Sequence, residues 1–404
     1  MTAEPARPRR LKSVDAIRAH QRAWLAETRE RALRGEPFAI CNSDECEEIL
    51  TALDVPMVVI NYWSAVIARE GKTRHFADVL RAHGYPAAPS HALGFGTTLD
   101  PENAPWGGLP QPAIIVGSTR DEGYLRVAEL WARQVGCPVF PLDFNFVGQF
   151  SVTLPPDWWT RMRDDWESVV DPHRLALRHE QLKGLVAYLE LLLGRPLSLA
   201  RLREVVEQRN RQMDLWIEAR DLIAHARPCP VSLRDQLALY QVTWQRGTET
   251  SYRLLHDYYE EVKALLADGA EAAPPERYRI LMATTGPDPA FHAYLRERHG
   301  AVIVTNNYMA IAELYAGTIH DDDPLRLLAA RQLFLFEKEP HWYVMQARQW
   351  GVDAVIGLEA PSGYPSEYRQ VIEAAGFPYL ALPRDADDPE VRAMLDTFVA
   401  TRLA

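Results

Sequence analysis

Cysteine is scarce in this chain, with four residues among 404: Cys41, Cys46, Cys137 and Cys229. They form no metal-ligand cluster, and four scattered thiols fit a reducing compartment better than a disulfide framework. No stretch approaches the roughly 18 uninterrupted apolar residues of a membrane span. Residues 1–10 lack the apolar core of a signal peptide. We therefore expect a cytoplasmic protein that does not enter a membrane.

Positive charge is also in deficit. The chain has 44 Lys and Arg residues against 55 Asp and Glu, which gives a net charge of −11. Binding to a nucleic-acid backbone requires clustered Lys and Arg, and the one basic run lies in the N-terminal tail at residues 7–12. The sequence therefore predicts no nucleic-acid partner. The 47% of apolar residues and the length favour a globular protein of two or three domains.

Strand-like and helix-like patterns alternate near the N-terminus. Short apolar runs at 38–40, 55–60, 113–116 and 138–142 are separated by segments with helical spacing. This alternation is typical of a parallel sheet with crossover helices. Residues 90–112 are rich in Gly, Pro, Thr and Asn, so we expect a long irregular loop there, of the kind that often serves function.

The middle of the chain changes character. Residues 156–266 show no convincing strand, and a linker rich in Ala, Pro and Glu follows at 268–276. The strand and helix alternation returns after residue 277. The sequence thus predicts an α/β protein in which two open Rossmann-like parallel-sheet domains, 1–155 and 277–404, flank a helical block with its linker, 156–276.

Ligands of open α/β sheets bind beyond the carboxyl ends of the strands, which selects the loops 42–45, 117–121, 284–288 and 358–363. Asn42 and Ser43 follow a predicted strand and open a helix, so they either contact a ligand or cap the helix. Gly117 and Ser118 leave room for an anion at a helix N-terminus, although the Gly-Lys-Ser/Thr ending of a P-loop is missing. A simple cap is the alternative there.

Three more residues are candidates. Thr285 occupies the corresponding loop of the second domain, where a capping turn is the alternative. Glu359 is an acid or base if it is desolvated, and His91, in the long loop, is a base or a ligand. Each has the alternative of a solvated surface group. We predict no metal site, because the strand-to-helix transition between Cys41 and Cys46 is expected to turn their side chains in different directions.

Four segments in succession resemble the subunits of 2-hydroxyacyl-CoA dehydratases and benzoyl-CoA reductases, of the 2-hydroxyglutaryl-CoA dehydratase D-component type. They are PFAICNSDECEEILTALDVPMVVIN, AIIVGSTRDEGYLRVAELWARQVGCPVFPLDFNF, YRILMATTGPDP, and WYVMQARQWGVDAVIGLEAPSG followed by GFPYLALPRDADD. The resemblance implies an acyl-CoA thioester substrate, a homologous partner subunit and an ATP-dependent activator protein that supplies an electron. It also implies a four-iron four-sulfur cluster held by three cysteines.

The chain departs from this family in its cysteines. The resemblance places the cluster cysteines near 90–92, 117–118 and 362–363, and none of these positions is a cysteine. Because iron–sulfur clusters are held chiefly by thiolates, we expect no cluster in this chain and allow one in a partner subunit. The resemblance also places Ser43 near the acyl group, and the loops at Gly117, Thr285 and Ser362 around the thioester.

Three functions follow as hypotheses. The first is an acyl-CoA-binding subunit of such a hetero-oligomer, a lyase or reductase without its own cluster. The second is a cluster-free acyl-CoA lyase or hydratase in which Ser43, His91 and Glu359 transfer protons. The third is a structural partner subunit without catalysis. In the first two, the predicted substrate contacts are Asn42, Gly117, Ser118, Thr285 and Ser362.

Overall fold

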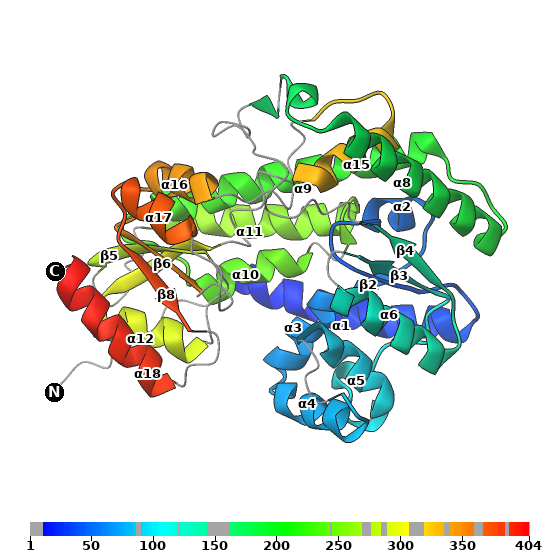
Figure 1. Ribbon diagram of the computed structural model, residues 1–404, viewed down its shortest axis with the longest axis horizontal. Helices are drawn as coiled ribbons and strands as arrows, with labels where there is room; N and C mark the ends of the chain where they lie inside the picture. Colours follow the sequence, from blue (N-terminus) through cyan, green and yellow to red (C-terminus); the bar gives the residue numbers. More distant parts are fainter. Residues whose placement is uncertain are drawn as a thin grey trace.

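The computed structural model describes residues 11–85, 90–119, 122–143, 161–162, 164–242, 245–268, 276–283, 289–306, 319–334, 340–358, 367–383 and 388–403. It contains two four-stranded parallel sheets with long helices between and around them (Figure 1). The predicted α/β class is therefore confirmed. Within these residues, no helix has the length and the apolar character needed to cross a membrane.

The first sheet is built from short, apolar strands near the N-terminus. These are β1 (Ala39–Cys41), β2 (Met57–Val59), β3 (Ile114–Ser118) and β4 (Val139–Leu142), in the order β2-β1-β3-β4. All residues of β1 and β2 are buried, as expected for a parallel sheet covered on both faces. The surrounding helices are α1 (Lys12–Leu33), α2 (Glu47–Ala52), α3 (Ile60–Arg69), α4 (Thr73–Ala82), α5 (Leu93–Leu99) and α6 (Glu122–Val135).

The expectation of a long irregular loop at 90–112 is wrong. This segment holds α5 and three single 3₁₀ turns, Ser90–Ala92, Pro101–Asn103 and Pro105–Gly107. The glycines that suggested a loop instead allow close packing of α5. A Cβ at Gly94 would lie 3.0 Å from the Trp131 ring and 3.2 Å from the Trp63 ring. The composition of this segment therefore led to a wrong prediction, because glycine is common both in loops and at close contacts between helices.

The middle of the chain is helical, as predicted. It contains a 3₁₀ turn (Trp166–Ser168) and helices α8 (Pro172–Leu193), α9 (Leu199–His225), α10 (Leu233–Val242) and α11 (Glu249–Ala267), and its described residues include no strand. Helix α8 has clear end signals: the Asp171 carboxylate accepts the N–H groups of His173 and Arg174, and Gly194 ends the helix in a left-handed conformation. Helix α1 packs against α10 and α11.

The second sheet repeats the topology of the first. Its strands are β5 (Tyr278–Met282), β6 (Ala301–Asn306), β7 (Ala354–Leu358) and β8 (Tyr379–Leu382), in the order β6-β5-β7-β8. The helices of this part are α12 (Pro289–His299), α15 (Pro324–Phe334), α16 (Pro340–Gln349), α17 (Glu367–Ala374) and α18 (Asp388–Phe398), followed by a π-helical turn (Val399–Leu403).

Alternate residues of the second sheet face two different cores. Ile280 and Met282 pack with Phe291 of α12 and Leu395 of α18, whereas Leu281 between them belongs to the main core of the molecule. This follows from the two-residue period of a strand. The sheet is thus covered on both faces, and the main core continues from it through the helical block to the first sheet.

Helix α15 does not stay beside the second sheet. It packs on α8 and α9, and its position near α2 is visible in the ribbon (Figure 1). A segment from the C-terminal part of the chain therefore reaches the carboxyl edge of the first sheet. This arrangement brings distant residues to the loop after β1.

Candidate functional site

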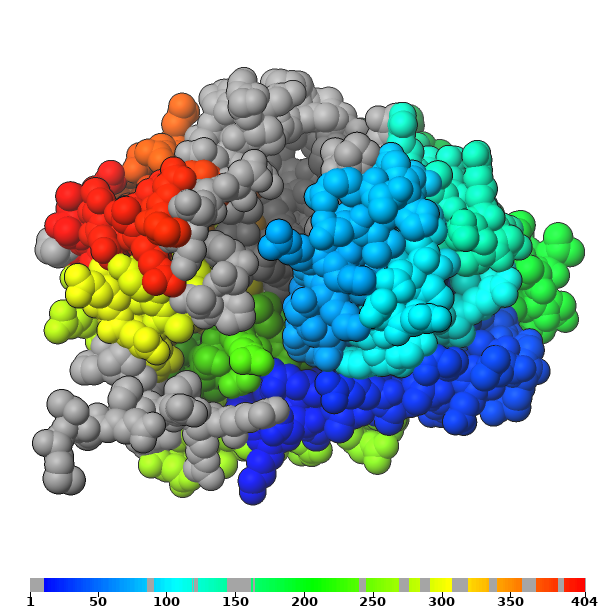
Figure 2. Space-filling view, turned by 90° about the horizontal axis from the view of Figure 1, so that it is seen from below, coloured from blue at the N-terminus to red at the C-terminus, as the bar shows by residue number. Residues whose placement is uncertain are grey.

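The strand order places a topological switch point between β1 and β3. Residue Cys41 at the end of β1 pairs with Val116 of β3, so Asn42 and Gly117 are the next residues at one edge of the sheet. Open α/β sheets bind ligands at such points. The surface is also hollowed beside the N-terminal part, blue to cyan (Figure 2). The loops after β1 and β3 are therefore the candidate site.

The loop after β1 is held from inside by Glu47. The Glu47 carboxylate accepts the backbone N–H groups of Asp44 at 2.7 Å, Glu45 at 2.9 Å and Cys46 at 3.2 Å. Asp44 has a φ of 70°, a conformation that Asp tolerates better than most residues. Burial raises the pKa of Glu47, and the charges of Asp44 and Glu48 add to this effect, while Arg246 opposes it. The loop is thus rigidly shaped by a buried carboxyl group.

Two arginines from the helical part of the chain pair with this loop. Arg246 Nη1 lies 2.5 Å from Asp44 Oδ1, and Arg246 Nη2 donates to the Tyr62 hydroxyl at 3.1 Å. Arg209 of α9 lies 2.7 Å from Glu48, Nε to Oε1, and both side chains are at most 4% exposed. Buried ion pairs of this kind fix the relative positions of their side chains more reliably than they increase the net stability of the fold.

Helix α15 supplies two further polar side chains. Gln332 donates from Nε2 to the Glu45 carbonyl at 2.8 Å and accepts from Arg178 Nε at 2.6 Å. Its neighbour Arg331 is 1% exposed and donates from Nη2 to Asn210 Oδ1 at 2.6 Å. Sequence reasoning missed these residues, because arginines on helices ordinarily indicate a solvated face.

The structure places three of the predicted residues at this edge in buried positions. Asn42 is 2% exposed, and neither atom of its amide group has a hydrogen-bond partner. Ser43 is buried beside it. His91 is 7% exposed and stacks on Tyr124, with ring centroids 3.9 Å apart and planes 9° from parallel. The Tyr124 hydroxyl donates to Asn61 Oδ1 at 3.1 Å.

The other predicted residues divide into two groups. Gly117 lies at the same edge, but a Cβ there would lie 3.1 Å from the Ala128 Cβ, so α6 fills the space beside it. Ser118 is the last residue of β3. Thr285, Glu359 and Ser362 lie outside the described residues. The structure therefore places the predicted site residues that follow strands of the first sheet.

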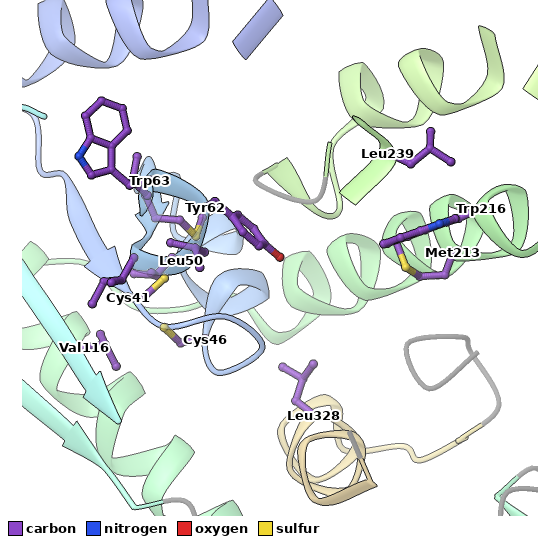
Figure 3. Packing of buried hydrophobic residues seen from close by; sticks show 14 of the residues in the cluster. Cys41, Cys46, Leu50, Tyr62, Trp63, Val116, Met213, Trp216, Leu239 and Leu328 are labelled. Atoms are coloured by element: carbon purple, nitrogen blue, oxygen red, sulfur yellow. The ribbon is translucent and has the colours of Figure 1, made fainter. Parts of the chain in front are cut away.

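The expectation that Cys41 and Cys46 point in different directions is wrong. Their thiols lie near one another inside the main core, in the same cluster as Leu50 and Leu328 (Figure 3). The neighbouring Cys46 thiol and burial raise the pKa of Cys41 well above its ordinary value. The chain turns back at Asp44, which brings the two side chains together. In the part of the chain that the structure describes, no group of three or more Cys, His, Asp or Glu residues is arranged to hold a metal ion.

A cavity of about 660 Å³ lies at the opposite edge of the first sheet. Its lining includes Arg31, Pro37, Ala113 and Arg195, close to the amino ends of β1 and β3. Ligands of open α/β sheets bind at the carboxyl edge, so the cavity does not coincide with the expected site. We therefore assign the site from the strand ends rather than from this cavity.

Comparison with known protein families gives a match over most of the chain. Residues 43–403 match the family model described as 2-hydroxyglutaryl-CoA dehydratase, D-component. The match begins in the loop after β1 and includes β2 to β4, the helical block and the second sheet. No curated protein matches the chain.

Proposed function

The chain belongs to the 2-hydroxyglutaryl-CoA dehydratase D-component family, and on this basis we propose that it is a cytoplasmic subunit of a dehydratase-type hetero-oligomer that binds an acyl-CoA thioester. The binding site in this proposal is the carboxyl edge of the first sheet. Family membership supports the class of complex and its homologous partner subunit. The thioester site is our inference from the residues at this edge.

Asn42 is the observation that carries the proposal. A buried side-chain amide nearly always has hydrogen-bond partners, and the Asn42 amide has none although it is 2% exposed. It lies at the switch point, on a loop whose shape Glu47 and Arg246 hold. A thioester carbonyl accepts a hydrogen bond from an amide N–H, so a bound acyl group would satisfy the Nδ2 group of this side chain. Ser43 lies next to it in the same loop.

The thiols of this chain do not fit a four-iron cluster. Cys41 and Cys46 face each other inside the core, and Cys137 precedes β4 at the opposite edge of the sheet. Cys229 is buried near the start of α10, with its thiol 3.5 Å from the Val231 carbonyl. Three thiolates are therefore not gathered at one place within the described residues. We propose that a cluster, with the ATP-dependent activator that would serve it, belongs to the partner subunit.

His91 favours a second candidate, a cluster-free acyl-CoA lyase or hydratase. Its imidazole is buried against Tyr124 at the start of α6, which follows the β3 loop. A histidine beside a bound thioester is a suitable group for proton transfer. In this candidate Ser43 and Glu359 share the proton transfer, and turnover of the chain with its partner falls on His91→Gln substitution.

The test is titration calorimetry of the chain, co-purified with its partner subunit, with butyryl-CoA. We expect Asn42→Ala to weaken binding about tenfold or more, as for loss of a hydrogen bond to a buried group. The control is Asn103→Ala, an exposed asparagine that bonds Asp100 far from this edge. Absence of binding by the unsubstituted complex would leave only the structural-partner hypothesis. Iron and sulfide analysis of the same complex shows whether the partner carries a cluster.

A further inference from the structure

Helix α8 carries apolar side chains on two opposite faces. Leu175, Leu182 and Leu189 lie on its inner face and are buried. Leu177 and Leu191 lie on its outer face, where they are 49% and 82% exposed. A surface helix ordinarily has a polar outer face, whereas a helix that is apolar all round is covered on both sides. The outer face of α8 is therefore suited to contact with another protein surface.

The apolar positions of the outer face follow one another along the helix. Leu177, Gly184 and Leu191 are spaced by seven residues, and Ala187 lies between the last two. Seven residues make about two turns of an α-helix, so each leucine stands about 10 Å from Gly184 on nearly the same side. We call these four residues the outer stripe. Single exposed leucines are common on protein surfaces, but a contiguous apolar surface indicates an interaction site.

Small residues occupy the middle of the outer stripe. Gly184 and Ala187 are exposed, and neither has a side chain longer than a methyl group. A second helix can therefore approach the backbone of α8 closely at this point, because the distance between packed helices depends on the side chains at the contact. Leu177 and Leu191 would then pack on either side of the contact. The outer stripe thus has the shape of a helix-docking face.

The charges beside the middle of the outer stripe cancel. The Lys183 Nζ atom lies 2.8 Å from Glu180 Oε1 on the same helix. A like-charged surface would disfavour contact between two copies of the same face. This neutral pair removes that obstacle at the centre of the face.

The outer stripe does not include the side of α8 that reaches the candidate site. Arg178 on the inner face donates to Gln332, which bonds the loop after β1. Figure 1 shows α8 on the outer side of the molecule, at the end away from the second sheet. A protein bound to the outer stripe therefore leaves the contacts of the candidate site in place.

We propose that the outer stripe binds a second copy of this chain, with the two α8 helices antiparallel and a two-fold axis beside Gly184. A two-fold interface is self-complementary, because both copies use the same patch. Leu177 and Leu191 lie at equal distances on either side of Gly184, so Leu177 of one copy meets Leu191 of the other. The antiparallel order also places opposite ends of the two helix dipoles together.

The available surface is large enough for such a contact. Helix α8 has 22 residues and is therefore about 33 Å long. A strip of this length and about 11 Å wide supplies about half of the roughly 800 Å² that each partner buries in a standard interface. Two more exposed leucines extend the surface at the C-terminal end of α8. Leu199 begins α9 after a short turn, and Leu33 ends α1, whose Ala32 lines one cavity with Leu192.

The first test is the mass of the complex of the chain with its partner subunit, measured by light scattering over a dilution series. We expect two copies of the chain in the unsubstituted complex. Ala187→Asp and Leu191→Asp each place one charge per copy inside the contact, and should raise the dissociation constant of the two copies about a hundredfold or more. The matched control is Ala264→Asp, at an exposed alanine of α11, which should keep both copies.

The second test reports the orientation of the helices. Leu177→Cys and Leu191→Cys variants are oxidised with copper phenanthroline, separately and as a mixture, and mass spectrometry identifies the disulfide-linked peptides. In the antiparallel arrangement, position 177 of one copy faces position 191 of the other. We therefore expect linked chains in the mixture and not in either variant alone. Linkage within one variant alone would overturn the antiparallel arrangement.

Three results of the first test would overturn the proposal. One is a complex that holds a single copy of the chain at every concentration. Another is a pair of copies that survives both Asp substitutions, because a different surface then joins them. The third is loss of the partner subunit instead of the second copy in Ala187→Asp, because the partner subunit then covers the outer stripe. The proposal does not depend on acyl-CoA binding, which calorimetry tests separately.

Discussion

The ion pair between Arg209 and Glu48 offers the sharpest stability prediction. Its partners lie on α9 and α2, and the 2.7 Å separation with exposures of 2% and 4% makes it a buried pair. Replacing Arg209 by Met keeps a long apolar stem and removes the charge. Glu48 is then left in the core without its partner. We expect a large loss of stability, although the net contribution of the intact pair is small.

The magnitude follows from the geometry. At 2.7 Å and an effective dielectric constant of about 20, the attraction is about 6 kcal/mol before desolvation is subtracted. Loss of one partner of a buried pair costs about 3–5 kcal/mol. We therefore expect a loss of about 3–5 kcal/mol at pH 7.

The assay is urea unfolding at pH 7, followed by circular dichroism. The double variant Arg209→Met/Glu48→Gln should recover most of the loss, because neither charge remains. The control is Arg211→Met, an exposed arginine two residues further along α9, with an expected effect within about 0.5 kcal/mol. A loss below about 1 kcal/mol, or a double variant as unstable as the single one, would refute the reasoning.

Three further predictions concern single residues. Asp171→Ala removes the cap of α8 and should cost about 1 kcal/mol of stability at neutral pH. Hydrogen bonds from first-turn N–H groups lower the pKa of Asp171, so the stability that the cap contributes is lost as the pH falls through that lowered value. The melting curves of the variant and the unsubstituted protein should therefore converge in acid. Gly247→Ala should lower the free energy of unfolding by about 2 kcal/mol or more in chemical unfolding, since the new Cβ would lie 2.6 Å from the Val205 carbonyl oxygen at a φ of 74°. An unchanged free energy of unfolding would show that the neighbouring segments shift freely. Burial raises the pKa of Cys229 to about 11. A thiol reagent at pH 8 should therefore modify the half-buried Cys137 first and reach the buried Cys229 only on unfolding. Mass spectrometry of partly labelled protein gives the order of modification.

Most strands and helices were predictable, because local patterns determine them. Alternating apolar runs and capping residues gave both sheets and the helical middle, and the position of Asn42 and Ser43 after β1 followed from the same patterns. The segment 90–112 was predicted wrongly, since its glycines serve close contacts with Trp63 and Trp131 that composition does not reveal. The switch point required the strand order, which depends on pairing between distant segments.

The sequence alone determined the α/β class, the edge of the sheet where a ligand is expected, and the lack of cysteine at the positions where the family resemblance requires it. Only the tertiary structure decided which charges meet at that edge. Arg246 pairs with Asp44 across 202 residues, and α15 carries Arg331 to α9 across 121. Such pairings arise because burial removes alternatives: a charge taken out of water must find the nearest available partner, whatever its distance along the chain. No local pattern records that partner.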